Sequence, residues 1–226
     1  MNSRSYITSV AMGILFAMAF SLSIAFVFLT TIESAEAVHG TSATKTTSPQ
    51  ATVPPEPSSL LAFSSNGNGT CSVIGIGSCL DASIIIPAFA PNGDAVTAIA
   101  PRAFYGCPTV TAIHIPAGVA FIGNLAFGDC KSLSFITVSE DNLAYRSVEG
   151  VLYSADLSVL IQYPPKRAGE SVIIHTSTTV VREMAFYDAA YLRRICYKGS
   201  ADQWEMISVG GKNYALLAAA KEFGVT

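Results

Sequence analysis

Charged residues are scarce in this sequence: only 13% of its 226 residues are Asp, Glu, Lys or Arg, while 50% are hydrophobic. After residue 70 there are 11 Lys and Arg against 13 Asp and Glu. The chain therefore lacks both the basic footprint of a nucleic-acid-binding protein and an acidic tail, and we expect no nucleic-acid partner. The composition is also too apolar for a soluble domain throughout, which indicates that part of the chain is directed to a membrane.

The motifs of metal sites and common enzymes are missing as well. None of the five cysteines belongs to a C-x-x-C pair, and H-E-x-x-H and G-x-S-x-G do not occur. Gly75-x-Gly77 lacks the third glycine and the following helix of a phosphate-binding loop. His39, His114 and His175 have no nucleophile in a recognisable elbow, so surface histidines are the simpler explanation. We expect no enzyme activity, no cofactor and no metal.

The amino-terminal segment is apolar and uncharged. No residue between Arg4 and Glu33 is charged, and residues 10–29 form a nearly unbroken apolar run. A bilayer-spanning helix needs about 20 apolar residues, so the length favours a retained anchor. Ala35-Glu36-Ala37 has the form of a signal-peptidase site, which makes a cleaved signal peptide the alternative. Either way, residues 1–37 form a signal peptide or signal anchor, and the positive-inside rule places the remainder outside the cytoplasm, anchored at the cell surface or secreted.

The next segment is poor in residues that build a core. Ser, Thr, Pro and Gly occupy more than half of the positions from 38 to 70. Such a stretch buries too little apolar surface to fold. We therefore expect a disordered tether over residues 38–70 that holds the folded domain away from the membrane.

An internal repeat follows the tether. Val96-Thr-Ala-Ile99, with Ala103-Phe104 after it, recurs as Val119-Ala-Phe-Ile122 with Ala126-Phe127, a step of 23 in the numbering. Val110-x-x-Ile113-x-Ile115 recurs at the same step as Leu133-x-x-Ile136-x-Val138, the strand pattern of leucine-rich repeats. Alternation sends Ile113 and Ile115 inward and His114 outward. A single repeat cannot cover the inward face, so stacking into a parallel solenoid is expected.

The sequence resembles the BspA-like, or treponemal-type, leucine-rich repeat family over about residues 70–210. The blocks that carry the resemblance are Gly75-Ile-Gly-Ser-Cys79, Ile84-Ile-Ile-Pro87, Ala103-Phe-Tyr-Gly-Cys107, Ile113-His-Ile-Pro116, Ala126-Phe-Gly-Asp-Cys130, Glu140-Asp-Asn-Leu-Ala-Tyr145, Gly150-Val-Leu-Tyr153 and Tyr197-Lys-Gly-Ser-Ala-Asp-Gln-Trp204. The resemblance implies a mainly β solenoid with short helices, in which repeats of this length build a parallel sheet. Some members of the family are surface adhesins.

Two segments depart from the repeat within and after the predicted solenoid at residues 71–210. Residues 140–170 hold two apolar stretches around a polar turn, which predicts a β-hairpin that projects from the solenoid. Ser200-Ala-Asp-Gln203 is a capping box that opens a short helix. Residues 211–226 are predicted to be a helix that caps the open end of the solenoid.

The Ala-Phe blocks are expected to place an aromatic plug in every coil, with Gly106 or Gly128 in a tight turn beside it.

The cysteines fall into two groups. Cys107 and Cys130 are separated by the repeat length, so a structural ladder at a turn position explains them better than a zinc site. Cys71 and Cys79 bracket the start of the solenoid, where a disulfide between them would staple the first coil. The spacing leaves both the bonded and the free state open.

Two classes of function fit this pattern: an exported module for protein–protein recognition, such as adhesion, and a structural envelope or stalk component without a dedicated ligand. For the first class, a protein partner is expected on the outward strand positions, which carry no carboxylate. These positions are Ile85, His114, Thr137, Ile173 and Cys196, with Phe135 and Arg194 beside them. The alternatives are that the tether, the hairpin or a neighbouring chain covers this face, or that the hairpin itself is the binding element.

Overall fold

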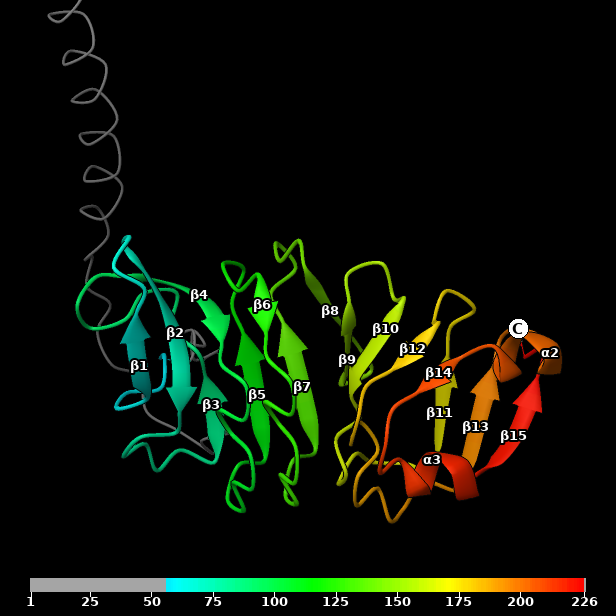
Figure 1. Cartoon of the computed structure of the whole chain (residues 1–226). Helices are drawn as coiled ribbons and strands as arrows, with labels where there is room; N and C mark the ends of the chain where they lie inside the picture. The colour runs from blue at the N-terminus through cyan, green and yellow to red at the C-terminus, as the bar shows by residue number, and fades with distance from the viewer. Residues whose placement is uncertain (1–55, 226) are drawn as a thin grey trace, which may run out of the picture. The chain divides into compact units, whose positions relative to one another are not determined.

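The computed structural model describes residues 56–225, which belong to one compact unit. The expected signal peptide or anchor at residues 1–37 and most of the expected tether lie outside the described residues. Strands dominate the described part (Figure 1). They are β1 Ala62–Ser65, β2 Thr70–Gly75, β3 Ser83–Ile85, β4 Ala95–Ile99, β5 Ala112–Ile115, β6 Phe121–Ile122, β7 Phe135–Val138, β8 Tyr145–Val148, β9 Val151–Ser154, β10 Val159–Gln162, β11 Ser171–Ile174, β12 Val180–Val181, β13 Arg194–Tyr197, β14 Ser208–Val209 and β15 Ala220–Phe223; α2 Ala201–Glu205 and α3 Tyr214–Ala218 are short helices. Within residues 56–225 no helix has the length and apolar character needed to cross a membrane.

The strands stack as the coils of a solenoid, as the repeat predicts. Strands β3, β5 and β7 form one parallel sheet, and β11, β13 and β15 form another. The opposite wall contains β2, β4 and β6 in parallel, followed by β10, β12 and β14 in parallel. Ile113 pairs with Ile136, its equivalent one repeat later, so the sequence period is the advance of one coil.

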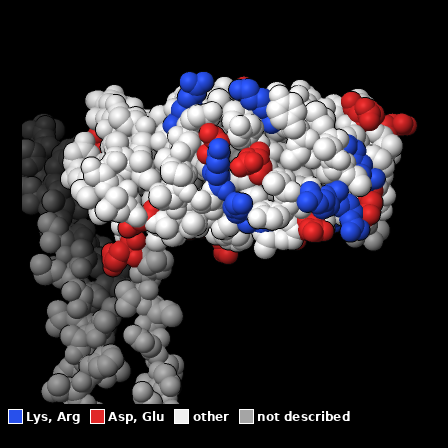
Figure 2. Space-filling view, turned by 90° about the horizontal axis from the view of Figure 1, so that it is seen from below, with Lys and Arg blue, Asp and Glu red and all other residues white. Residues whose placement is uncertain are grey.

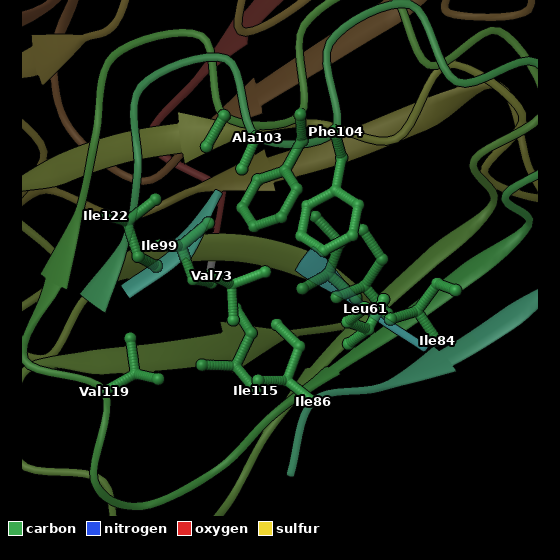
Figure 3. Close-up of a cluster of buried hydrophobic side chains, with 14 of the residues drawn as sticks. Leu61, Val73, Ile84, Ile86, Ile99, Ala103, Phe104, Ile115, Val119 and Ile122 are labelled. Carbon is green, nitrogen blue, oxygen red and sulfur yellow. The ribbon is translucent and has the colours of Figure 1, made fainter. Parts of the chain in front are cut away.

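The inward side chains form the core. Ile84, Ile113 and Ile136 lie in register on adjacent strands and are fully buried. Figure 3 shows how such side chains from successive strands gather beneath Phe104. Removing each of these side chains from water contributes roughly 1.5–3 kcal/mol, and this burial holds the coils together.

Aromatic rings are stacked along the solenoid at the Ala-Phe positions. Phe104 lies on Phe127 with ring centroids 5.9 Å apart, and Tyr163 lies on Phe186 at 4.9 Å. Tyr163 precedes Phe186 by one repeat length, so it is the plug of a coil that has no Ala-Phe motif. The expected aromatic plug is therefore present, even in a coil that lacks the Ala-Phe motif.

The turns beside these aromatic residues use left-handed backbone at fixed positions. Gly106 has φ 71°, and the equivalent residues one and several coils later are Asp129 at 55° and Asp188 at 58°. Gly128 lies in the expected turn, where its N–H donates to the carbonyl of Leu125 at 3.0 Å, but the left-handed residue is its neighbour Asp129. Asp tolerates this conformation better than most residues, which explains its presence in two of the three turns.

The folded domain begins earlier than the sequence analysis expected. Strand β1 pairs antiparallel with β2, and Leu61 just before it is buried. Ser58 donates its backbone N–H to the carbonyl of Ile85 at 2.8 Å, so residues ahead of β1 cover the free edge of β3. The expected tether therefore ends before Ser58, not at Thr70. Short local hydrogen bonds and one buried leucine order a segment whose composition alone indicates disorder.

The carboxyl-terminal end is another coil, not the predicted capping helix over residues 211–226. The capping box of Ser200 and Gln203 is confirmed and opens α2. Helix α3 is only five residues long, and β15 follows it and pairs in parallel with β13. Lys221 on β15 takes the inward position of Ile195, and its ammonium group donates to the carbonyls of Leu217 and Ala219. An inward lysine on an edge strand opposes pairing with a further strand.

The insertion at residues 140–170 forms a hairpin of β9 and β10, as predicted, but the hairpin does not project. Strand β10 pairs in parallel with β12 of the next coil, and β9 pairs antiparallel with β8. Leu152 and Leu160 are fully buried. The hairpin is therefore built into the wall of the solenoid, because its apolar residues are buried only if it packs against the neighbouring coil.

Candidate functional site

The first half of the expected outward ladder is in place. Ile85 pairs with His114, and His114 pairs with Thr137, on β3, β5 and β7. The Nδ1 atom of His114 lies 2.9 Å from the hydroxyl of Thr137, so this part of the face is hydrogen-bonded across strands. Phe135 lies two residues before Thr137 on β7, and its side chain is 45% exposed.

The second half of the ladder lies on β11, β13 and β15. Ile173 pairs with Cys196, and Cys196 pairs with Glu222. Glu222 accepts from Arg194 in an ion pair of 3.1 Å. The expectation that the ladder carries no carboxylate is therefore wrong at the last strand, which the sequence analysis interpreted as helix. Both partners are about half exposed, so the pair contributes at most about 1 kcal/mol.

The two halves do not form one continuous ladder. Strands β8 and β9 form a second hairpin, distinct from the one of β9 and β10. Its turn, residues 148–150, lies between β7 and β11 and is here called the hairpin tip. The backbone N–H of Ile136 on β7 donates to the carbonyl of Gly150 at 3.1 Å, and the hydroxyl of Ser147 donates to the carbonyl of Ile136 at 2.6 Å. Gly150 has φ 83°, and an added Cβ would lie only 2.5 Å from the Phe135 ring. The expected line from Thr137 to Ile173 is thus interrupted by an element that bonds to β7 in place of β11.

Arg167 joins the hairpin tip to β11. Its Nε donates to the backbone carbonyl of Glu149 at 2.9 Å, and its Nη2 lies 2.6 Å from the Glu149 carboxylate. Its Nη1 donates to the carbonyls of Ala168 at 3.2 Å and Ser171 at 3.0 Å. The side chain of Arg167 is only 11% exposed, against 58% for Glu149. A single guanidinium therefore bridges the gap between the two sheets.

A cavity of about 240 Å³ lies beside this junction, here called the junction cavity. Its lining residues are Val148, Glu149, Tyr153, Leu157, Val172, Ile173, His175 and Lys198. Most of this wall is apolar. Burial raises the pKa of the Tyr153 phenol well above its usual value, an effect that the nearby Arg167 opposes, so the hydroxyl stays neutral at ordinary pH. Sequence reasoning placed only Ile173 of this set in a site.

Charge is distributed unevenly over the domain. Residues 57–130 contain four charged side chains, whereas residues 131–226 contain 20. Figure 2 shows the same contrast on one face, where blue and red side chains gather over the C-terminal part. A partner that covers both halves therefore meets a nearly uncharged surface on one side and a mixed charged surface on the other.

The five cysteines differ in burial: Cys71, Cys79 and Cys130 are buried, whereas Cys107 and Cys196 are partly exposed. The buried thiol of Cys130 donates to the carbonyl of Phe104 at 2.9 Å, and burial raises its pKa to about 12. Cys107 is half-buried, not fully buried as a strict ladder requires. Cys71 and Cys79 are both buried, and both are free thiols in the structure. A disulfide between them stays a prediction. Among residues 56–225, no three His, Cys, Asp or Glu side chains cluster closely enough to hold a metal ion.

Comparison with known proteins agrees with the repeat analysis. Residues 91–149 match the family model described as BspA type leucine-rich repeat region (6 copies), which confirms the resemblance. A leucine-rich cell surface protein of Faecalibacterium prausnitzii is 35% identical, with a TM-score of 0.44, over 51% of this chain and 29% of that chain. A leucine-rich repeat protein from Eubacterium ventriosum is 22% identical, with a TM-score of 0.43, over 51% of this chain and 32% of that chain. The T. pallidum leucine-rich repeat protein is 19% identical, with a TM-score of 0.43, over 63% and 71% of the two chains.

This chain thus spans less than a third of the length of the first two of these proteins. No curated protein matches the sequence.

Proposed function

Since residues 91–149 carry leucine-rich repeats of the BspA type, we propose that the chain is an exported recognition module that binds a protein partner on its outward sheet face. Export is supported by the apolar run at residues 10–29 and the acidic residues that follow it. Either a retained anchor or cleavage after Ala37 places the solenoid outside the cytoplasm. Adhesion is the form of recognition that the family resemblance favours.

The observation that carries this proposal is the exposure of large apolar side chains on the outward strands. Phe135 is 45% exposed and Ile173 is 47% exposed, although each belongs to a regular strand with a buried neighbour. A face that serves only solubility has no need of such residues. Arg194 lies on the same face, and aromatic and arginine side chains dominate the energetics of protein interfaces.

The experiment is a capture assay with the full chain in detergent micelles. Proteins from the envelope of the source organism and from surfaces it contacts are captured, and each one identified is purified and titrated against the chain. The test variant combines Phe135→Ala with Arg194→Ala. The matched control combines Tyr105→Ala with Arg102→Ala, an equally exposed aromatic–arginine pair with Arg102 stacked 5.7 Å from the Tyr105 ring, in a turn away from the outward strands.

We expect the sheet-face variant to weaken binding by at least about tenfold and the control variant to leave it unchanged. Equal losses in both variants would place the contact elsewhere. Failure to retain any specific protein would instead favour the structural envelope component. Retention by the sheet-face variant with loss on Asp156→Ala, at the exposed turn between β9 and β10, would assign binding to the hairpin.

A further inference from the structure

One edge of β11 is unpaired within the described residues. Strand β11 is the terminal strand of its sheet and bonds only to β13. The backbone N–H groups of Arg194 and Lys198 donate to the carbonyls of Glu170 and Ile174, so the even-numbered residues of β11 bond toward β13. Ser171 and Ile173 therefore direct their backbone groups to the opposite edge. The carbonyl of Ser171 is occupied there by Arg167, whereas Ile173 has no strand partner on that side.

The junction cavity opens beside this edge. Val148, Leu157 and Ile173 form apolar parts of its wall, and Tyr153 adds a hydroxyl. Its volume of about 240 Å³ is below the range of roughly 300–1,000 Å³ that is usual for small-molecule and cofactor sites. The cavity is therefore better matched to one large side chain of a peptide than to a whole ligand.

The charged groups at the cavity are not balanced. The carboxylate of Glu149 is paired with Arg167 at 2.6 Å. Lys198 lines the same cavity and forms no ion pair with any residue from 56 to 225. His175 is exposed at the same end of β11. The cavity wall therefore favours a ligand that brings a carboxylate.

From these three observations we propose that an extended segment of the protein partner pairs with the free edge of β11, inserts one large apolar side chain into the junction cavity and places a carboxylate, carried two residues away on the same face of the segment, on Lys198. This inference rests on the proposed recognition function and specifies the chemistry of the partner. Backbone hydrogen bonds to Ile173 supply affinity that does not depend on sequence, while the cavity and Lys198 select the side chains.

The probe is a panel of fluorescein-labelled, amidated hexapeptides, Thr-Val-Xaa-Thr-Glu-Thr, in which Xaa is Ala, Val, Leu or Phe and the glutamate lies on the same face of the extended peptide as Xaa. A second panel replaces the glutamate by glutamine. Binding to the full chain in dodecylmaltoside micelles is followed by fluorescence anisotropy. We expect the Leu or Phe peptide of the glutamate panel to bind best and its Ala counterpart to bind at least about tenfold more weakly.

Two variants locate the peptide. Val148→Trp fills the mouth of the cavity from a partly exposed position and is expected to weaken the best peptide by at least about tenfold. Lys198→Met is expected to weaken the glutamate peptide by about three- to tenfold and to leave its glutamine analogue unchanged. The matched control is Lys131→Met, an exposed lysine on the other half of the solenoid, which is expected to change neither. Far-UV circular dichroism and Tm establish that each variant is folded.

The inference is overturned if no peptide distinguishes the wild-type chain from Val148→Trp, or if Lys198→Met weakens both panels equally. It is also overturned if the captured partner binds the two cavity variants as well as the wild-type chain while losing affinity for the variant of Phe135 and Arg194. That last result would leave recognition by the sheet face intact, so failure of the inference and failure of the proposed function are separate outcomes.

Discussion

Replacing Arg167 by alanine tests how the two halves of the solenoid are joined. The guanidinium donates to three backbone carbonyls, those of Glu149, Ala168 and Ser171, and to the Glu149 carboxylate. All three acceptor residues are exposed, so water can replace the lost donors once the side chain is removed. The net loss is then close to the usual value for one hydrogen bond, about 1 kcal/mol for each carbonyl.

With up to about 1 kcal/mol more from the ion pair, we expect Arg167→Ala to lower the free energy of unfolding by about 3–4 kcal/mol, measured by urea denaturation with circular dichroism. Glu149→Ala removes only the carboxylate and keeps the backbone carbonyl of residue 149. Because that carboxylate is 58% exposed, its ion pair contributes at most about 1 kcal/mol. The ion pair is lost in both variants, so they should differ by the three bonds to carbonyls, roughly 3 kcal/mol, and this difference should change little with salt because the acceptors are neutral.

Arg193→Ala is the control, since Arg193 is exposed and donates to a single carbonyl, that of Ala190. Since it loses one such bond, it should lower the free energy of unfolding by no more than about 1 kcal/mol. The reasoning is refuted if Arg167→Ala costs no more than this control. Equal costs for Arg167→Ala and Glu149→Ala would show that the ion pair, and not the bonds to the backbone, joins the hairpin tip to β11.

Three further predictions concern other parts of the domain. Burial raises the pKa of the Cys130 thiol to about 12. Cys130 should therefore react with N-ethylmaleimide at pH 8 far more slowly than the half-buried Cys196, as followed by peptide mass mapping. Equal rates would contradict the burial of Cys130. Hydrogen bonds, chiefly from Ser154, lower the pKa of Asp156 from 3.8 to about 2. The ionised carboxylate therefore stabilises the fold above pH 3.8, and this stabilisation is lost as the pH falls through 2. The urea midpoints of the wild type and Asp156→Asn should converge between these pH values, and a difference that stays constant would contradict the prediction. Lys221→Val should produce dimers or larger species in sedimentation velocity at concentrations where the wild-type chain is monomeric, because it removes the inward charge from the edge strand β15; unchanged sedimentation would show that the edge is blocked in another way.

The sequence predicts the repeating part of the fold well, because one physical constraint acts on every coil. Ile84, Ile113 and Ile136 must face the same core, so their spacing records the strand register directly. The capping box of Ser200 and Gln203 is equally local, and it is present as predicted. Such features depend only on residues that lie near each other in the sequence or one repeat apart.

The parts that were predicted wrongly depend on what the chain packs against. Residues 214–223 have apolar residues at helical spacing, yet β15 forms because the edge of β13 offers a full set of backbone partners. In the same way, the hairpin of β9 and β10 packs into the wall because β12 supplies an edge for β10. Neither neighbour can be inferred from the local sequence pattern.

The position of the junction was visible in the sequence, although its chemistry was not. The step from Ile136 to Val172 is longer than one repeat, so the sequence holds an insertion between these two strands. Additional residues between two consecutive sheet strands can either loop outward or separate the strands. Arg167, which decides between these by fixing the hairpin tip to β11, belongs to no repeated motif, so no periodicity marks it.

The split of the sheet has a consequence for recognition. A continuous ladder would present equivalent positions along its length, and a partner could slide by one coil at little cost. Here the half with β3, β5 and β7 is nearly uncharged, the half with β11, β13 and β15 carries Arg194 and Glu222, and a free edge and a cavity separate them. We therefore expect contacts at the junction, together with this difference in charge, to hold a partner in a single register.

For this reason Val148→Trp should weaken partner binding more than a tryptophan placed at the exposed Phe121, which lies on β6 of the opposite wall. Equal binding by the two tryptophan variants, measured by titration with the captured partner, would show that the register is set away from the junction.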